Sequence, residues 1–254
     1  MASHRRLFAG MLSVLCLGGC ATVVPASWKV VPDGQAMADA YPGFASHAGI
    51  EGKASLVCQS GIDGRLSDCR VEKVAPLGLG FDAAALKLTE RFESNPQTRN
   101  GVARPSEVAF RITFALPPVE PVLPWNEPEP SPEHLALARE IAPRYVGSLR
   151  QGRSAISLDG LDADRIETVQ AMIAALDREF RPEAVEARAL AMARTIPADV
   201  LPGLAVGQRR PARSPDMTDE RLERANDRVR EIGQRANARL NALYCAAYDC
   251  SDAL

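Results

Sequence analysis

Hydrophobic and polar residues alternate most regularly between residues 106 and 116 of this chain. Because successive side chains of a strand point to opposite faces, a period of two predicts a strand with one apolar face. Pro117 and Pro118 follow it and end the predicted strand, since proline cannot donate to a sheet. The apolar positions are Val108, Phe110, Ile112, Phe114 and Leu116, and the residues between them are Ala109, Arg111, Thr113 and Ala115.

A strand pair is predicted around Asp63-Gly64, within LVCQSGIDGRLSDCRV (residues 56–71). Asp-Gly favours a two-residue type I′ turn, which needs positive φ at both central residues. A turn centred there places Cys58 opposite Cys69, as a hydrogen-bonded pair with Cα atoms about 5.5 Å apart. A disulfide fits that distance and would stabilise the fold by about 3 kcal/mol. Two free buried thiols or half of a zinc site are the alternatives, although zinc sites use shorter paired spacings.

A helix is predicted after this hairpin, in GFDAAALKLTERF (residues 80–92). Its apolar residues recur every three or four positions and so form one stripe. The following NPQTRNGVARP (residues 95–105) contains two prolines and Asn100-Gly101, and it predicts a loop. The residues of the stripe are Phe81, Ala84, Ala85, Leu88 and Phe92.

The C-terminal half, residues 132–254, is predicted to be an all-α helical domain behind a semi-rigid, Pro-rich and Glu-rich linker at residues 119–131. Ser131 as N-cap, with Pro132 at the first helical position, opens a helix to about Leu149. Further helices are predicted from Asp162 to Phe180, from Pro182 to Arg194 and from Thr218 to Ala246, with a short piece from Pro197 to Val206.

Residues 1–19 have the order of a signal peptide: Arg5 and Arg6 come first, and an apolar run ends at Leu17. Leu-Gly-Gly-Cys (residues 17–20) resembles a bacterial lipobox, which implies cleavage before Cys20 and acylation of that cysteine. The mature protein would then be held to a membrane by lipid through a tether at residues 20–47. Ala21 in place of aspartate favours the outer membrane over the inner one. An ordinary secretory signal with an incidental cysteine is the alternative.

Cleavage would leave four cysteines in an oxidising compartment, where disulfides persist. Cys245 and Cys250 lie five residues apart, so a disulfide between them requires the last helix to end near Tyr248; whether they pair stays open. The net charge of −2 gives no indication of a nucleic-acid partner.

Candidate chemistry is sparse. The two histidines outside the signal peptide, His47 and His134, are isolated, and the motifs of metalloproteases, serine hydrolases and nucleotide-binding loops do not occur. We therefore predict no catalytic residue, no metal site and no cofactor. An envelope hydrolase that uses paired carboxylates is the least favoured alternative, because such pairs leave no spacing signature.

The order of strand, Asp-Gly turn, strand, helix, Asn-Gly loop and long aromatic strand resembles the TonB C-terminal domain family, over residues 48–118. The resemblance implies an α+β fold, in which a helix packs on a small three-stranded antiparallel sheet, and here a separate helical domain follows. The matching pieces are Gly61–Leu66, Phe81–Leu86, Asn100-Gly101 and Val108–Phe114.

The resemblance also implies a role. Domains of this family bind a short segment of an outer-membrane receptor in the periplasm, as an extra strand on an open sheet edge. The membrane-spanning helix and long periplasmic spacer of an energy transducer are not recognised in this sequence. We therefore predict a lipid-anchored, periplasm-facing module that binds an envelope or outer-membrane protein; a structural envelope lipoprotein is the alternative. The predicted partner-binding edge strand holds Val108, Phe110, Arg111, Ile112, Thr113 and Phe114, which could equally be a solvated sheet face.

Overall fold

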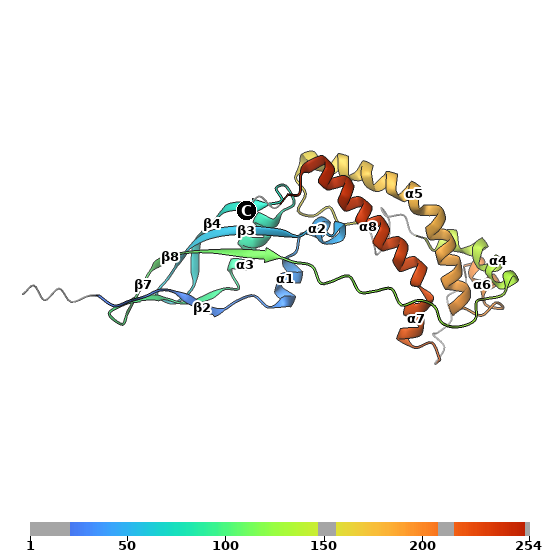
Figure 1. The fold of residues 1–254 in the computed structure, drawn as a ribbon, viewed down its shortest axis with the longest axis horizontal. Coiled ribbons are helices and arrows are strands. Elements are labelled where there is room, and N and C mark those ends of the chain that lie inside the picture. The colour runs from blue at the N-terminus through green and yellow to red at the C-terminus, as the bar shows by residue number, and fades with distance from the viewer. Residues whose placement is uncertain (1–20, 147–155, 208–215, 252–254) are drawn as a thin grey trace, which may run out of the picture.

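The computed structural model describes residues 21–146, 156–207 and 216–251. The predicted signal peptide and Cys20 lie outside these residues. The molecule is elongated, with a sheet towards one end and helices at the other (Figure 1). The predicted α+β fold with a helical C-terminal part is confirmed. The main sheet has the antiparallel order β4-β3-β8, with β3 at Gly52–Ser60, β4 at Leu66–Ala75 and β8 at Ser106–Phe114, and α3 (Phe81–Thr89) packs on it.

The β3–β4 hairpin forms, but its turn differs from the predicted one. The amide of Gly64 donates to the carbonyl of Gly61, so the central residues are Ile62 and Asp63. Only Gly64 in this turn has a positive φ, of 83°. The predicted two-residue turn at Asp63-Gly64 is therefore wrong, because the chain uses the longer connection that a left-handed glycine closes.

Two register shifts follow in the same hairpin, and one of them affects the cysteines. It coincides with Asp68, whose φ is 48°, so that β4 carries an extra residue there. Cys58 and Cys69 nevertheless form the predicted disulfide, with Cα atoms 4.1 Å apart. The predicted separation of about 5.5 Å is too long because the bulge replaces a regular hydrogen-bonded pair.

The segment before β3, expected as a tether, carries folded elements. The strand β2 pairs with β5, and β1 pairs with β6. Phe44, in α2, is fully buried in the main core. This segment is therefore part of the folded sheet unit, although Val23 and Val24 stay more than half exposed. The elements of this segment are β1 (Val23–Val24), β2 (Ser27–Val30), α1 (Gly34–Ala40) and α2 (Gly43–Ala48), and the partner strand β5 is Glu93–Asn95.

The stretch predicted as a loop at residues 95–105 contains a second hairpin, of β6 (Gln97–Arg99) and β7 (Val102–Arg104). Asn100 and Gly101 connect the two strands and have φ values of 54° and 79°. Positive φ at both central residues is the geometry of a two-residue type I′ turn. The loop prediction is therefore wrong, and Asn-Gly takes the turn that we predicted for Asp63-Gly64.

The helical part begins as predicted, since the hydroxyl of Ser131 accepts a hydrogen bond from the amide of His134. The first helix ends at Ile141, where a 3-10 turn containing Pro143 follows it, and the predicted end near Leu149 lies outside the described residues. The short helix predicted from Pro197 to Val206 is present only as α6, at Leu201–Ala205. The elements are α4 (Pro132–Ile141), η1 (Ala142–Arg144), α5 (Ala163–Thr195), α6 (Leu201–Ala205), α7 (Asp219–Ala225) and α8 (Asp227–Tyr248).

Pro182 lies inside α5 and does not start a new helix. A proline removes one helical hydrogen bond and bends the helix, and α5 bends along its length in Figure 1. Val169 and Ile173, before the proline, belong to the main core, whereas Ala189 and Met192 belong to a second core with α4 and α6. One helix therefore serves two cores, and the prediction of two separate helices is wrong.

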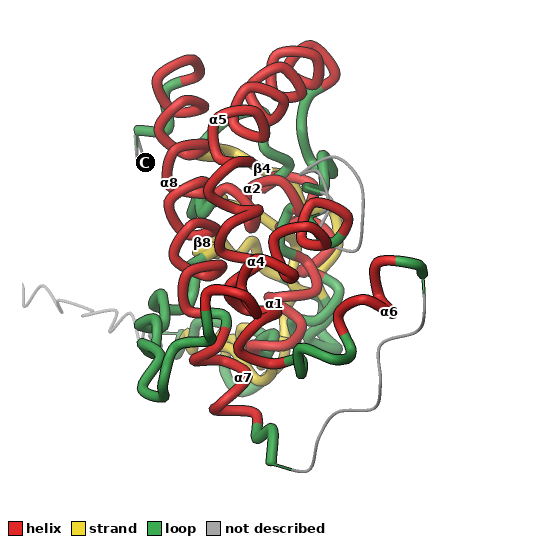
Figure 2. The backbone as a smooth tube through the Cα atoms, turned by 90° about the vertical axis from the view of Figure 1, so that its right-hand side faces the viewer, coloured by secondary structure: helices red, strands yellow, loops and turns green. Residues whose placement is uncertain are grey.

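The predicted last helix is two helices, which meet at Asn226. The backbone of Asn226 leaves the helical region there, with φ of −98° and ψ of 15°, and both its main-chain and side-chain amides donate to the carbonyl of Leu222. As Figure 2 shows, α8 then runs beside α5 at the helical end of the molecule. It ends at Tyr248, and Cys245 and Cys250 form a disulfide there with Cα atoms 4.9 Å apart.

The segment predicted as a linker is bound to the helices, and we call residues 119–130 the strap. The buried guanidinium of Arg194 donates to the carboxylates of Glu129 and Asp227, at 2.7 and 2.8 Å. It also lies over the ring of Trp125, 4.9 Å from the ring centroid. Burial would raise the pKa of Asp227, but hydrogen bonds from the amides of Trp125 and Arg228 and from Arg194 hold it below its usual value.

The sheet unit and the helices share the main core. The rings of Phe44 and Tyr244 lie 5.1 Å apart, and both side chains are fully buried. Arg165 of α5 donates to the hydroxyl of Tyr244 and to the carbonyl of Leu77, at 2.7 Å each. The amide of Asn241 donates to the carbonyl of Gly49. The helical part is therefore packed on the sheet unit and not only joined to it by the strap.

Candidate partner-binding sheet edge

The strand β8 lies at one edge of the main sheet and β4 at the other. All nine residues of β8 pair with β3 without a register shift, whereas β4 has two shifts and the disulfide. Bulges and twisted pairings blunt a sheet edge against further strands. Among the described residues, β8 therefore has the edge that is better shaped for another strand.

The predicted site residues divide between the two faces of β8. Ile112 and Phe114 are buried, at 4% and 0% exposure, and Val108 and Phe110 are half-buried. Arg111 and Thr113 are exposed on the other face. The alternation predicted from sequence is thus present in the structure.

An aromatic cluster covers the buried face of β8. Trp28 of β2 lies 4.9 Å from both Phe92 and Phe110, measured between ring centroids. The sequence analysis missed this residue, because the segment around it was expected to be a tether. The spacing of Trp28 and Val30 was the available signal, since alternate apolar residues indicate a strand. Trp28 therefore joins β2 to the strand that we consider for binding.

A cavity of about 300 Å³ lies between β2 and the first half of β8. Its lining includes residues 106–109 of β8, which is an edge strand of the main sheet. The hydroxyl of Ser106 is buried and has no hydrogen-bond partner in the structure. The cavity thus offers both apolar contacts and an unused polar group. Its lining residues are Pro25, Ala26, Ser27, Trp28, Ser94, Gln97, Ser106, Glu107, Val108 and Ala109.

The far end of β8 is fixed by a tyrosine. The hydroxyl of Tyr41 donates to the carbonyls of Ile50 and Phe114, at 2.9 and 3.4 Å. Burial, followed by the charge of Glu51, raises the pKa of Tyr41 to about 12, so the hydroxyl keeps its proton. The strand is therefore held in place at Phe114 and has its cavity at the opposite end.

The solvent face of the sheet carries mixed charge. Arg70 of β4 lies 3.6 Å from the carboxylates of Glu72 and Glu107, and all three side chains are more than half exposed. Exposed ion pairs contribute at most about 1 kcal/mol. These charges therefore contribute little to the stability of the fold.

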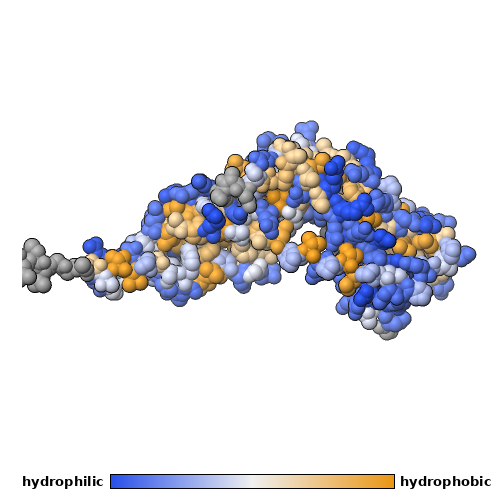
Figure 3. Space-filling view, in the orientation of Figure 1, coloured by the Kyte–Doolittle hydropathy of each residue, from blue (hydrophilic) through white to orange (hydrophobic). Residues whose placement is uncertain are grey.

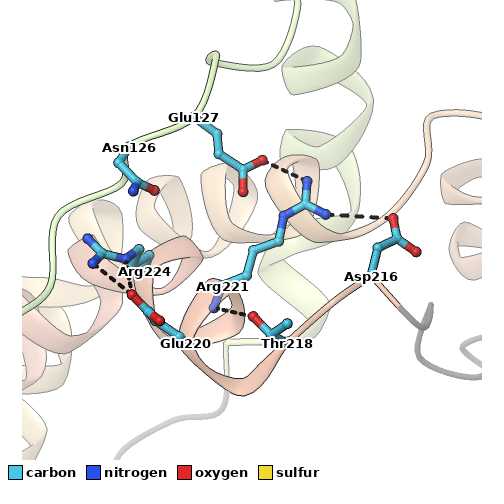
Figure 4. Close-up of a pocket in the computed structure, with 7 residues that line it drawn as sticks. All are labelled: Asn126, Glu127, Asp216, Thr218, Glu220, Arg221 and Arg224. Atoms are coloured by element: carbon cyan, nitrogen blue, oxygen red, sulfur yellow. Dashed lines mark hydrogen bonds and ion pairs between the residues drawn. The ribbon is translucent and has the colours of Figure 1, made fainter.

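A second cavity, of about 430 Å³, lies in the helical part. Figure 4 shows Glu127 and Asp216 pointing at the guanidinium of Arg221 from two sides, at 2.8 and 3.8 Å. Arg224 pairs with Glu220 at 2.9 Å. The three carboxylates that line this cavity are thus paired with arginines, and the Glu127–Arg221 pair joins the strap to α7. Asn126 and Thr218 complete the lining.

The histidines do not form a site together. Burial lowers the pKa of His47 at the end of α2, and a ring nitrogen of His134 lies 2.9 Å from the carbonyl oxygen of Ile196. In the described parts of the chain, no group of three His, Cys, Asp or Glu side chains is arranged to hold a metal ion. No helix there is long and apolar enough to span a bilayer.

Comparison with known proteins supports the fold assignment. Residues 37–116 match the family model described as Gram-negative bacterial TonB protein C-terminal, and this match covers less than half of the 254 residues. It begins in α1 and so includes part of the segment that we expected to be a tether. Neither the curated proteins nor the solved structures contain a match to this chain. Residues 37–116 thus form a domain of the TonB C-terminal family, which relates this chain to the TonB-type systems of the Gram-negative cell envelope.

Proposed function

We propose that this chain is a lipid-anchored, periplasm-facing module that binds another envelope protein through the open edge of β8. The partner contributes an extended segment, which lies against β8 as a fourth strand. Main-chain hydrogen bonds supply most of the affinity in this mode of recognition, and pockets for alternate side chains supply the specificity. The observation that carries the proposal is the regular, unshifted pairing of β8, together with a cavity lined by residues 106–109 of the same strand.

The cavity supports a preference for certain partner residues. Trp28, Pro25 and Val108 line it with apolar surface, while Ser106 and Ser27 bring hydroxyl groups. Trp28 is 39% exposed. A partner segment that places one apolar side chain against Trp28 would therefore bury part of its ring. A backbone amide of the same segment would give Ser106 the partner that it lacks.

A titration with short peptides from the periplasmic N-termini of outer-membrane receptors tests this function. We expect a peptide to bind, and the same peptide with N-methyl groups on alternate amides to bind far more weakly, because methylation removes the main-chain donors. Isothermal titration calorimetry measures both affinities. Equal affinity for the two peptides would contradict strand addition, and no binding by any such peptide would favour the structural lipoprotein.

The anchor needs a separate test. The lipobox-like tetrad supports acylation of Cys20, and Cys20→Ser removes the thiol that a lipid would modify. We expect wild-type cells to incorporate labelled fatty acid into the protein and the variant to incorporate none. Fractionation of inner and outer membranes then locates the labelled protein. Labelling of the Cys20→Ser variant, or none in the wild type, would rule out the anchor without affecting the peptide result.

The structural lipoprotein remains a second candidate because of the helical part. Its strap is held by the buried Arg194, which pairs with Glu129, and by Arg221 and Arg224 of α7, which contact Glu127 and the carbonyl of Pro124, and its two cores are joined by one bent helix. Such a rigid body is suited to a scaffold. In that case the sheet unit would serve only as a stable base, and deletion of the gene would change envelope integrity without affecting receptor-dependent uptake.

A further inference from the structure

The small sheet of β1, β6 and β7 forms the narrow end of the molecule, at the left of Figure 1. Directly opposed residues of antiparallel strands share a face. The register therefore aligns Val23, Arg99 and Val102 in one row across the three strands. Gln97 and Arg104 oppose each other two positions away and lie on the same face. We call these five residues the tip face.

The tip face combines exposed apolar and basic side chains. Val23 and Val102 are 52% and 55% exposed, and Arg99 and Arg104 are exposed as well. Neither arginine has an ion-pair partner among the described residues, and none of the residues of the three strands is acidic. Hydrophobic surface is visible at this narrow end in Figure 3. The tip face therefore combines two exposed arginines with two exposed valines.

We propose that the tip face contacts a lipid bilayer with anionic phosphate headgroups. Valine side chains would enter the boundary between headgroups and acyl chains, and the two arginines would bind phosphate groups beside them. The position in the chain supports a bilayer over a second protein as the occupant. Val23 is three residues from Cys20, and this argument rests on the acylation of Cys20 that we propose above.

Such a contact would orient the whole protein. A lipid chain alone leaves the protein free to rotate, whereas a lipid chain and an adjacent basic patch act as two signals and bind more stably than one. The long axis would then stand away from the bilayer, with α4 and α6 at its far end (Figure 1). The edge of β8 lies along that axis and so would stay open to a partner segment.

Vesicle binding by the chain that begins at Ala21 tests this contact without any lipid on the protein. We expect it to bind vesicles of equimolar phosphatidylethanolamine and phosphatidylglycerol, and to bind phosphatidylcholine vesicles much less. Arg99→Gln with Arg104→Gln should weaken binding about thirtyfold, since each charge near an anionic surface contributes about fivefold. Val23→Ser with Val102→Ser should weaken it as well. Sedimentation with vesicles measures both.

Matched controls change the same chemistry elsewhere on the surface. Arg91→Gln with Arg239→Gln removes two exposed charges, and Leu77→Ser with Val206→Ser removes two exposed apolar side chains. The proposal is overturned if these controls weaken binding as much as the tip variants, if anionic vesicles are not bound, or if the tip variants instead dissociate a dimer. Receptor-peptide affinity without vesicles should be unchanged in every variant. A negative result for vesicle binding would therefore leave the β8 proposal unaffected.

Discussion

Single residues decide the local geometry of the two hairpins. Both dipeptides, Asp63-Gly64 and Asn100-Gly101, are turn signals, yet only Asn100-Gly101 forms the two-residue turn with positive φ at both positions. At the other turn, Gly64 contacts β5, and its carbonyl accepts a hydrogen bond from the amide of Ser94. This tertiary contact lies thirty residues away in sequence. A local pattern could therefore predict that the chain reverses there, but not which residue would be left-handed.

Gly64→Ala should destabilise the protein much more than Gly101→Ala. Both glycines have positive φ, which costs other residues about 1–2 kcal/mol, so this strain is common to the two variants. A Cβ at position 64 would lie 2.1 Å from the carbonyl oxygen of Ser94, whereas a Cβ at position 101 would meet nothing within 4 Å. Urea denaturation measures the two free energies of unfolding. Equal losses would show that Gly64 does not pack against β5.

Asp227→Asn should cost about 2 kcal/mol, because the buried cation of Arg194 loses the less exposed of its two carboxylate partners and keeps only Glu129. Glu186→Gln is the matched control: it breaks the ion pair with Arg139, in which both side chains are about half exposed, and should cost less than about 1 kcal/mol. The folded pKa of Asp227 is depressed. Its contribution is therefore present above the unfolded value of about 3.9 and lost as the pH falls through the lower folded value.

Urea midpoints at pH 6 and pH 3 measure this dependence. The wild type should lose more stability between the two values than Asp227→Asn does. An identical loss in both proteins would mean that the strap does not depend on this carboxylate.

The elements show which parts of the fold a sequence can predict. Strong periodicity correctly predicted β8 and α3, whose apolar residues meet the core at the predicted positions. Pro182 misled the prediction because a proline usually marks a helix start, but α5 continues through it to reach two cores. The strands β1, β2, β6 and β7 have two to four residues each. Such short strands form through pairing with distant segments, which no local pattern contains.

Removal of the hairpin disulfide tests how independent the two sheet edges are. Cys58→Ala with Cys69→Ala should lower the free energy of unfolding by about 3 kcal/mol, because the unfolded chain is no longer restricted. Receptor-peptide affinity should persist, since the bond joins β4 to β3 while β8 pairs with the other side of β3. The Cys245–Cys250 disulfide closes a shorter loop, so its removal in Cys245→Ala with Cys250→Ala should cost about 2 kcal/mol. Loss of peptide binding in the first variant alone would place the partner at the β4 edge.

At the scale of the whole molecule, the sheet unit and the helices unfold together if the main core is shared. Phe44 and Tyr244 belong to the two halves and contact each other in that core. Sequence analysis separated the halves at a Pro-rich segment, because it could not show that apolar residues of α5 and α8 face α2 and the sheet. We expect one calorimetric transition whose measured enthalpy equals the van't Hoff value. Two resolved transitions would contradict a common core.

Tyr244→Ala provides the matching perturbation. Truncation of a large buried aromatic residue costs about 3–5 kcal/mol, and it should lower the transition of both halves. Tyr145→Ala, at a residue that is 44% exposed, is the control and should change little.

Hydrogen exchange of the β8 amides, measured with and without a bound receptor peptide, tests the central claim most directly. Half of the amides in Ser106–Phe114 point to β3 and half to the open edge, because the direction alternates along a strand. We predict that the peptide protects every second amide of β8 and leaves the amides of β4 unchanged. Protection that is uniform along β8, confined to β4, or absent despite saturating peptide would contradict the proposal that β8 accepts a partner strand.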